Sequence, residues 1–179
     1  MTYDIAIVGG GIIGAATFYK IQKAYPDLKI LLLEKEKGLA DHQTGNNSGV
    51  IHSGLYYKPG SSKAKYCVEG RHELVAFAKE YGVDHDVCGK IVVATSEKDL
   101  PFMDQIFENG IANKTEGLKK ITAEEIKDYE PDVVGIAGIW VPCTGIIDYR
   151  QATEKMVEVS LELQPKSKML LGTEAKVFH

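Results

Sequence analysis

The chain has 179 residues, of which 44% are hydrophobic and 26% are charged, and its formal net charge is −4. This length allows one buried core, or one domain with a smaller appendage. The negative balance argues against a nucleic-acid partner, which requires clustered positive charge. No stretch approaches the ~20 apolar residues of a membrane span, and no signal peptide precedes the first strand, so we expect a cytoplasmic protein. The cysteines, Cys67, Cys88 and Cys143, lack metal-ligand spacing, which predicts reduced thiols and no metal site.

The N-terminal segment has the pattern of a dinucleotide-binding turn. Residues 3–8 predict a strand, residues 9–14 read GGGIIG, and a helix is expected over residues 11–24. In this pattern Gly9 allows the tight turn, Gly11 lets a pyrophosphate approach the backbone, and Gly14 lets helix and sheet pack closely. The amides at the start of the helix, including that of Ile13, would then face the phosphates.

A second predicted strand, at residues 30–33, ends on Glu34. A carboxylate at this distance beyond the glycine turn accepts hydrogen bonds from ribose hydroxyls and disfavours a 2′-phosphate, which argues against NADP. Lys35 follows directly and is a candidate for a minor contact with the adenosine. These residues predict an adenine dinucleotide, and they leave FAD and NAD both open.

The remaining elements follow from periodicity and capping signals. Residues 35–62 form a glycine-punctuated loop whose apolar content argues against disorder. Helices are expected at residues 63–81, where Gly82 ends the helix, and at residues 100–108. A short helix is expected after a capping box at Thr122, and another at residues 149–163 after the N-cap Asp148. Strands are expected at residues 89–95, 136–141, 145–147 and 169–177.

This order predicts an interrupted α/β domain. Residues 1–82 are the first part of the nucleotide-binding domain, residues 83–147 are an excursion with strands and short helices, and residues 148–179 return to it. A plain NAD domain more often continues strand, helix, strand without leaving the sheet.

Several longer motifs resemble one enzyme family. The chain is similar to the L-2-hydroxyglutarate oxidase or dehydrogenase branch of the FAD-dependent D-amino-acid oxidase-like superfamily in these segments: NSGVIHSGLYYKPGS at 47–61, Lys63-Ala64, CVEG at 67–70, GKIVVAT at 89–95, Glu130-Pro131 and PCTGIID at 142–148. The resemblance implies FAD as the cofactor. It also implies a Rossmann-like FAD-binding domain of the glutathione-reductase-like βαβ type, interrupted by part of a mixed-sheet substrate domain.

The resemblance also implies site residues. Asn47, Ser48 and Gly49 are expected to contact the flavin, and the strand around residues 175–177, with Val177, is expected near the adenine. His52 is the expected catalytic base, because an imidazole titrates near neutrality. Tyr56 and Tyr57 are candidates for the substrate side, although aromatic residues in a loop more often simply pack.

The implied reaction is oxidation of a 2-hydroxy acid, with L-2-hydroxyglutarate giving 2-oxoglutarate by hydride transfer to flavin N5. Two alternatives stay open: a related FAD enzyme acting on glycerol 3-phosphate or an amino acid, and an NAD-binding dehydrogenase or a nucleotide-binding module without chemistry. Oxygen or a membrane quinone is the expected electron acceptor, and the family precedent allows peripheral contact with the inner face of the membrane. Members of the family are usually longer, so we expect this sequence to be the N-terminal portion of a larger protein.

Overall fold

The computed structural model describes residues 2–177. The chain divides into two compact units: Met1–Gly49, Tyr81–Asp84 and Asp148–His179 form the first, and Val50–Glu80 with His85–Ile147 form the second. Within residues 2–177, no helix combines the length and the apolar character needed to cross a bilayer.

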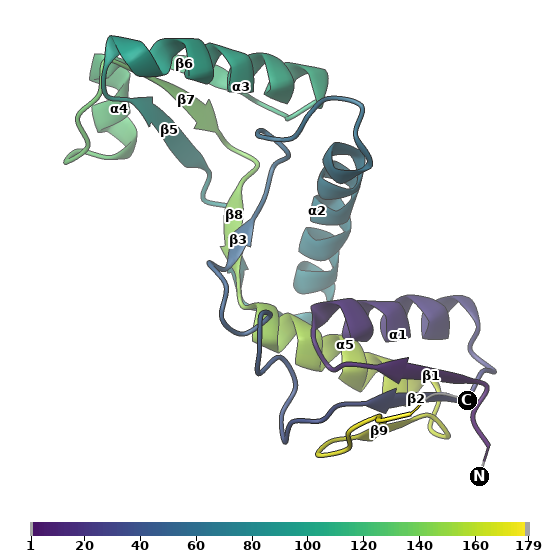
Figure 1. The fold of residues 1–179 in the computed structure, drawn as a ribbon. Helices are drawn as coiled ribbons and strands as arrows, with labels where there is room; N and C mark the ends of the chain where they lie inside the picture. The colour runs from purple at the N-terminus through teal and green to yellow at the C-terminus, as the bar shows by residue number, and fades with distance from the viewer. Residues whose placement is uncertain (1, 178–179) are drawn as a thin grey trace. The chain divides into compact units, whose positions relative to one another are not determined.

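The first unit is built on a parallel sheet with the strand order β1-β2-β9. Its elements are β1 (Ile5–Val8), α1 (Ile12–Ala24), β2 (Ile30–Leu33), α5 (Tyr149–Leu163) and β9 (Lys168–Leu170). Helix α1 packs against β1, β2 and α5 (Figure 1). The core is fully buried and apolar: Ala15, Phe18, Ile30, Leu32 and Ala152. This is the predicted strand–helix–strand unit, with its third strand reached only after the long excursion.

The second unit holds two antiparallel sheets, ordered β3-β8-β4 and β5-β7-β6. The strands are β3 (Val50–Ile51), β4 (His85–Asp86), β5 (Lys90–Ala94), β6 (Lys119–Thr122), β7 (Ala137–Val141) and β8 (Gly145–Ile147). The helices are α2 (Ser62–Tyr81), α3 (Leu100–Ala112) and α4 (Ala123–Tyr129), with a 3₁₀ turn, η1, at Glu97–Asp99. Helices α3 and α4 pack on the β5-β7-β6 sheet around a core that includes Met103, Ile106 and Ile139. The predicted α/β class is confirmed.

The compact units divide the chain differently from the predicted domain boundaries at residues 50–80 and at residues 83–84. The predicted boundaries keep residues 50–80 with the nucleotide-binding part, whereas the structure groups them with the second unit, because β3 pairs with β8. The chain returns to the first unit at Asp148, whose side chain caps α5 by accepting from the amide of Gln151. Which unit binds cofactor and which binds substrate stays a prediction.

Local sequence signals predicted most helices and strands correctly, but the predicted end of α3 and the predicted extent of the last strand were wrong. Helix α3 does not stop near Gly110, because this glycine is buried where an added Cβ would lie 2.6 Å from Leu118 and 2.7 Å from Leu55. The turn that follows is made instead by Lys114, at φ 58°. The last strand is Lys168–Leu170 rather than residues 169–177, because Gly172, at φ 63°, turns the chain. Strands β3, β4 and β6 were not predicted.

Candidate functional site

The glycine turn at the end of β1 has the geometry that its sequence predicts. Gly9 adopts a φ of 110°, a conformation that residues with a side chain rarely occupy. A Cβ on Gly14 would lie 1.9 Å from the carbonyl oxygen of Gly9, so the first turn of α1 rests directly on the turn. Both glycines are therefore required by the backbone.

The start of α1 has features that suit an anion. Its N-cap residue, Gly11, makes no side-chain capping hydrogen bond, and the first turn contains no acidic residue. The amide of Ile12 donates to the hydroxyl of Thr44 at 3.0 Å, and the side chain of Ile13 is 80% exposed. A helix N-terminus with this composition favours a negatively charged ligand.

Glu34 is fixed against the glycine turn. Its carboxylate is buried and accepts hydrogen bonds from the amide of Gly10 at 2.5 Å and from the amide of Glu36 at 2.9 Å. The backbone of Glu34 also accepts from Thr173, just after β9. The two halves of the sequence motif are thus in direct contact. The predicted bond from Glu34 to a ribose stays a prediction.

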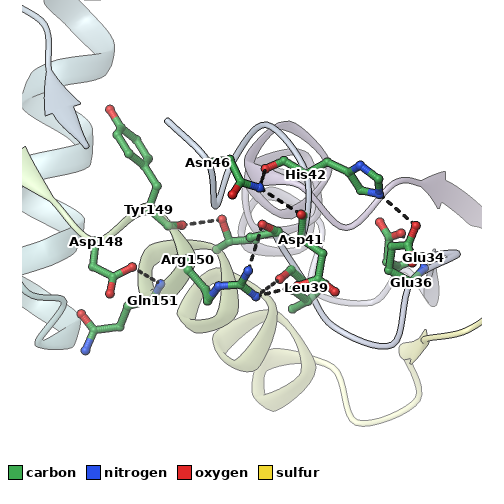
Figure 2. A network of polar contacts seen from close by, with 12 residues as sticks. Glu34, Glu36, Leu39, Asp41, His42, Asn46, Asp148, Tyr149, Arg150 and Gln151 are labelled. Carbon is green, nitrogen blue, oxygen red and sulfur yellow. Dashed lines mark hydrogen bonds and ion pairs between the residues drawn. The ribbon is translucent and has the colours of Figure 1, made fainter. Parts of the chain in front are cut away.

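The loop after β2 is held by a residue that the sequence did not reveal. Arg150, in the first turn of α5, donates to the carbonyl oxygen of Leu39 at 2.6 Å and to the carboxylate of Asp41 at 2.9 Å (Figure 2). It also donates to the carbonyl oxygen of Ala40 at 3.3 Å. An arginine near a helix N-terminus carries no sequence signal for such a role.

The other predicted cofactor residues of the first unit lie on its surface or shape their own turns. Asn47 accepts from the amide of Gly49 at 2.7 Å and donates to the carbonyl oxygen of Thr44 at 2.6 Å, which makes it a turn-forming residue here. Ser48 is exposed. Lys35 forms an exposed ion pair with Glu36 at 3.6 Å.

Val177 is 68% exposed and follows β9 outside any strand. Cofactor contacts of Asn47, Ser48, Gly49, Lys35 and Val177 stay predictions.

The predicted catalytic and substrate residues gather in the second unit. His52, Tyr56, Tyr57 and Lys90 line one small recess, of which Lys90 was not predicted. The ammonium group of Lys90 lies 4.5 Å from the ring centre of Tyr56, and that of Lys63 lies 4.6 Å from the ring centre of Tyr57. The signal for Lys90 was present in the Gly89-Lys90 motif, but a single lysine at a strand start has no evident role in sequence.

The electrostatics of the recess act on His52. Partial burial, followed by the positive charges of Lys90 and Lys63, lowers the pKa of the imidazole below its ordinary value. A lower pKa keeps the ring neutral, and a neutral imidazole can accept a proton. Burial also raises the pKa of the Tyr56 phenol, which therefore stays protonated. Among residues 2–177, no group of three His, Cys, Asp or Glu side chains is placed to hold a metal ion.

Comparison with known proteins assigns a family. The family model described as FAD dependent oxidoreductase matches residues 4–165. An L-2-hydroxyglutarate dehydrogenase of Indibacter alkaliphilus is 51% identical over 158 residues, which are 88% of this chain and 40% of that protein. The mitochondrial L-2-hydroxyglutarate dehydrogenase of Homo sapiens is 48% identical over 84% of this chain and 32% of its own length. The chain thus spans about two fifths or less of these relatives.

A solved structure gives the same assignment at the level of the fold. The FAD-bound L-alpha-glycerophosphate oxidase of Mycoplasma pneumoniae superposes with a TM-score of 0.88 and 29% sequence identity, over 97% of this chain and 46% of that one. Together with the match over residues 4–165, this likeness shows that the chain belongs to the FAD-dependent oxidoreductase family.

Proposed function

We propose that the protein is an FAD-dependent oxidoreductase that converts L-2-hydroxyglutarate to 2-oxoglutarate. The observation that carries this proposal is the 51% identity, over 88% of the chain, to a relative named for that substrate. Family membership alone supports only flavin-linked oxidation of a small molecule.

The first unit fits the cofactor. Gly14 brings the start of α1 against the glycine turn, and the N-terminus of α1 carries no side-chain cap from Gly11 and no acidic first turn. Diphosphate binding uses backbone amides at such a helix start, and the buried carboxylate of Glu34 is a suitable acceptor for ribose hydroxyls. When bound, FAD supplies the hydride acceptor for the oxidation. We assign Gly9, Gly11, Gly14 and Glu34 to its binding.

His52 is proposed as the base that takes the proton of the substrate hydroxyl. Its imidazole is held neutral by partial burial and by two nearby ammonium groups, as a base working near neutral pH requires. Tyr56 and Tyr57 line the same recess, and we assign them to the substrate side. The backbone carbonyl of His52 accepts from the Cys67 thiol at 3.4 Å, which holds the segment on α2.

The test is anaerobic mixing of the full-length, flavin-loaded protein with L-2-hydroxyglutarate. The measured quantity is the loss of the visible flavin absorbance with time. We expect rapid bleaching with this substrate and slow or no bleaching with its D enantiomer. The His52→Gln variant should retain flavin but bleach about 10²- to 10⁴-fold more slowly. Full flavin content with an unchanged rate would reject His52 as the base.

A second candidate is oxidation of glycerol 3-phosphate, which the likeness to L-alpha-glycerophosphate oxidase favours. The same mixing experiment with glycerol 3-phosphate separates the two functions. Bleaching by this compound and not by L-2-hydroxyglutarate would replace the first proposal.

The relatives are named dehydrogenases rather than oxidases, which favours an electron acceptor other than oxygen, and we propose a quinone. A quinone acceptor would bring the protein into peripheral contact with the membrane. The measurement is the rate of flavin reoxidation by a soluble quinone, compared with that in air-saturated buffer. Faster reoxidation in air would point to oxygen.

A further inference from the structure

Lys90 is a partly buried cation without a carboxylate partner. It lies at the start of β5, and burial lowers the pKa of its ammonium group. No ion pair joins it to a carboxylate among residues 2–177; the acidic group that acts on it is the Cys143 thiol, whose own pKa is raised by burial, and the ring of Tyr56 lies 4.5 Å away. Removing an ammonium group from water without pairing it is unfavourable, and binding an anion would offset that cost.

A second cation stands in the same neighbourhood. Lys63, at the beginning of α2, lies over the ring of Tyr57 at 4.6 Å and, like Lys90, acts electrostatically on His52. Each lysine therefore rests on one of two adjacent tyrosines. Stacking on an aromatic ring restricts the ammonium group, so less freedom is lost when it binds a ligand.

The backbone fixes where Lys90 begins its strand. Gly89 adopts a φ of 77°, and a Cβ there would lie 2.1 Å from the indole of Trp140. The amide of Gly89 also donates to the carbonyl oxygen of Thr144 at 2.8 Å. The backbone from which the Lys90 side chain extends is thus held in place, which suits a residue that must bind a ligand in a defined geometry.

The recess beside Lys90 is small, with a volume of about 10 Å³, and is lined by His52, Tyr56, Tyr57 and Lys90. This is close to the smallest volume that holds a single water molecule. One oxygen atom of a ligand fits such a space, whereas a whole organic acid does not. The chemistry of the recess, a cation with phenol and imidazole groups, suits a carboxylate oxygen.

We propose that Lys90 binds a carboxylate group of the substrate, with Lys63 as a weaker second cation. The inference rests on the proposed function and deepens it, because it assigns the residue that recognises an acidic substrate. A neutral or cationic substrate would leave both ammonium groups unpaired. Lys90 is accordingly a specificity-determining residue that favours organic acids.

The test measures the dissociation constant of glutarate, a non-reacting dicarboxylate, by calorimetry on the full-length, flavin-loaded protein. The Lys90→Met variant should bind glutarate about 10- to 100-fold more weakly, because a charge-assisted contact is lost. Lys63→Met should lose less. Lys90→Arg, which keeps the charge, should bind glutarate more tightly than Lys90→Met does. This result would also show that the position tolerates substitution.

Lys65→Met is the matched control, since Lys65 also lies on α2 over a tyrosine, Tyr66, at 6.0 Å, but does not act on His52. It should bind glutarate as the unchanged protein does. Equal affinity in Lys90→Met and Lys65→Met would overturn the proposal, as would an unchanged protein that binds no glutarate. If Lys90→Met does not fold, Lys90→Gln takes its place under the same criterion.

Flavin reduction separates this proposal from the proposed function. If the unchanged protein is not reduced by L-2-hydroxyglutarate, the proposed function fails, while glutarate binding still tests Lys90. If it is reduced, Lys90→Met should raise the substrate concentration for half-maximal reduction about 10-fold or more. A purely structural role for Lys90 would leave that concentration unchanged.

Discussion

The guanidinium group of Arg150 donates to the carbonyl oxygen of Ala40, and Ala40 has a φ of 60°. That backbone conformation is unfavourable for a residue with a Cβ and persists only where surrounding contacts impose it. The backbone amide of Ala40 in turn donates to the carbonyl oxygen of Gly10 at 3.0 Å. Helix α5 thus supports the proposed diphosphate turn through one strained residue.

The same two contacts hold the Ala40 backbone from both sides, the carbonyl through Arg150 and the amide through Gly10.

Replacing Arg150 should therefore weaken the first unit. Arg150→Met removes the hydrogen bonds to Leu39, Ala40 and Asp41, and we expect the free energy of unfolding to fall by about 1–3 kcal/mol. Flavin should also be lost more readily on dilution. Thermal melting and flavin content per protein are the measurements. Lys155→Met, which breaks only the ion pair with Glu158 on the same helix, is the control and should change stability by less than about 1 kcal/mol.

The close approach of α1 to the glycine turn gives a sharper prediction. In Gly14→Ala the new Cβ would meet the Gly9 carbonyl oxygen, so we expect a loss of about 2 kcal/mol or more and little bound flavin. Gly70→Ala is the control, because a Cβ there meets nothing within 4 Å inside α2. This control should be stabilised by up to about 1 kcal/mol, since alanine is the better helix former. Similar melting temperatures for both variants would contradict the close approach.

Gln22 joins three parts of the first unit. Its buried side-chain amide donates to the carbonyl oxygens of Tyr25, Pro26 and Leu28, and its oxygen accepts from Ser167, which in turn accepts from the amide of Ile30. Gln22→Met should cost about 2 kcal/mol, because the partly buried carbonyl oxygens and the Ser167 hydroxyl each lose one hydrogen-bond partner. A double-mutant cycle with Ser167→Ala should show a coupling of about 0.5–2 kcal/mol in denaturant unfolding. Strict additivity would mean that the two side chains act independently.

The buried guanidinium of Arg71 makes the second unit sensitive to acid. It pairs with Glu116 at 2.6 Å, and its side chain is only 7% exposed. Partial burial works to raise the pKa of Glu116, but hydrogen bonding to Arg71 and the charges of Arg71 and His72 outweigh it, so the pKa lies below its ordinary value of 4.5. The pair therefore stabilises the fold fully above pH 4.5 and progressively less as the pH falls through the lowered pKa.

Glu116→Gln tests this dependence. Because about half of the Glu116 side chain is exposed, we expect a loss of no more than about 2 kcal/mol at neutral pH. The difference between the two proteins should shrink toward acid pH, as measured by denaturant unfolding at a series of pH values. A difference that stays constant down to pH 3 would show that the carboxylate charge is not involved.

The local elements were readable because their signals lie close together in the chain. Asp148 and Thr122 are N-cap residues of α5 and α4, as their spacing predicted, and Gly82 turns the chain after α2 with a φ of 69°. Gly110 misled the interpretation because a glycine can end a helix or admit close packing. Only the contacts with Leu55 and Leu118 distinguish the two.

The sequence by itself determined the βαβ unit, the glycine turn and the place of Glu34 after the second strand, because each depends on spacing along a short stretch. The role of the segment containing His52 is what the family resemblance implies. Tertiary structure alone decided the pairing of β9 with β2 across the long excursion, the clamp of Arg150 on residues 39–41, and the place of Lys90 beside Tyr56. Those relationships join residues far apart in the chain. Since burial and charge are properties of the surroundings, neither the support of the strained Ala40 nor the unpaired state of Lys90 has a signal in the order of residues.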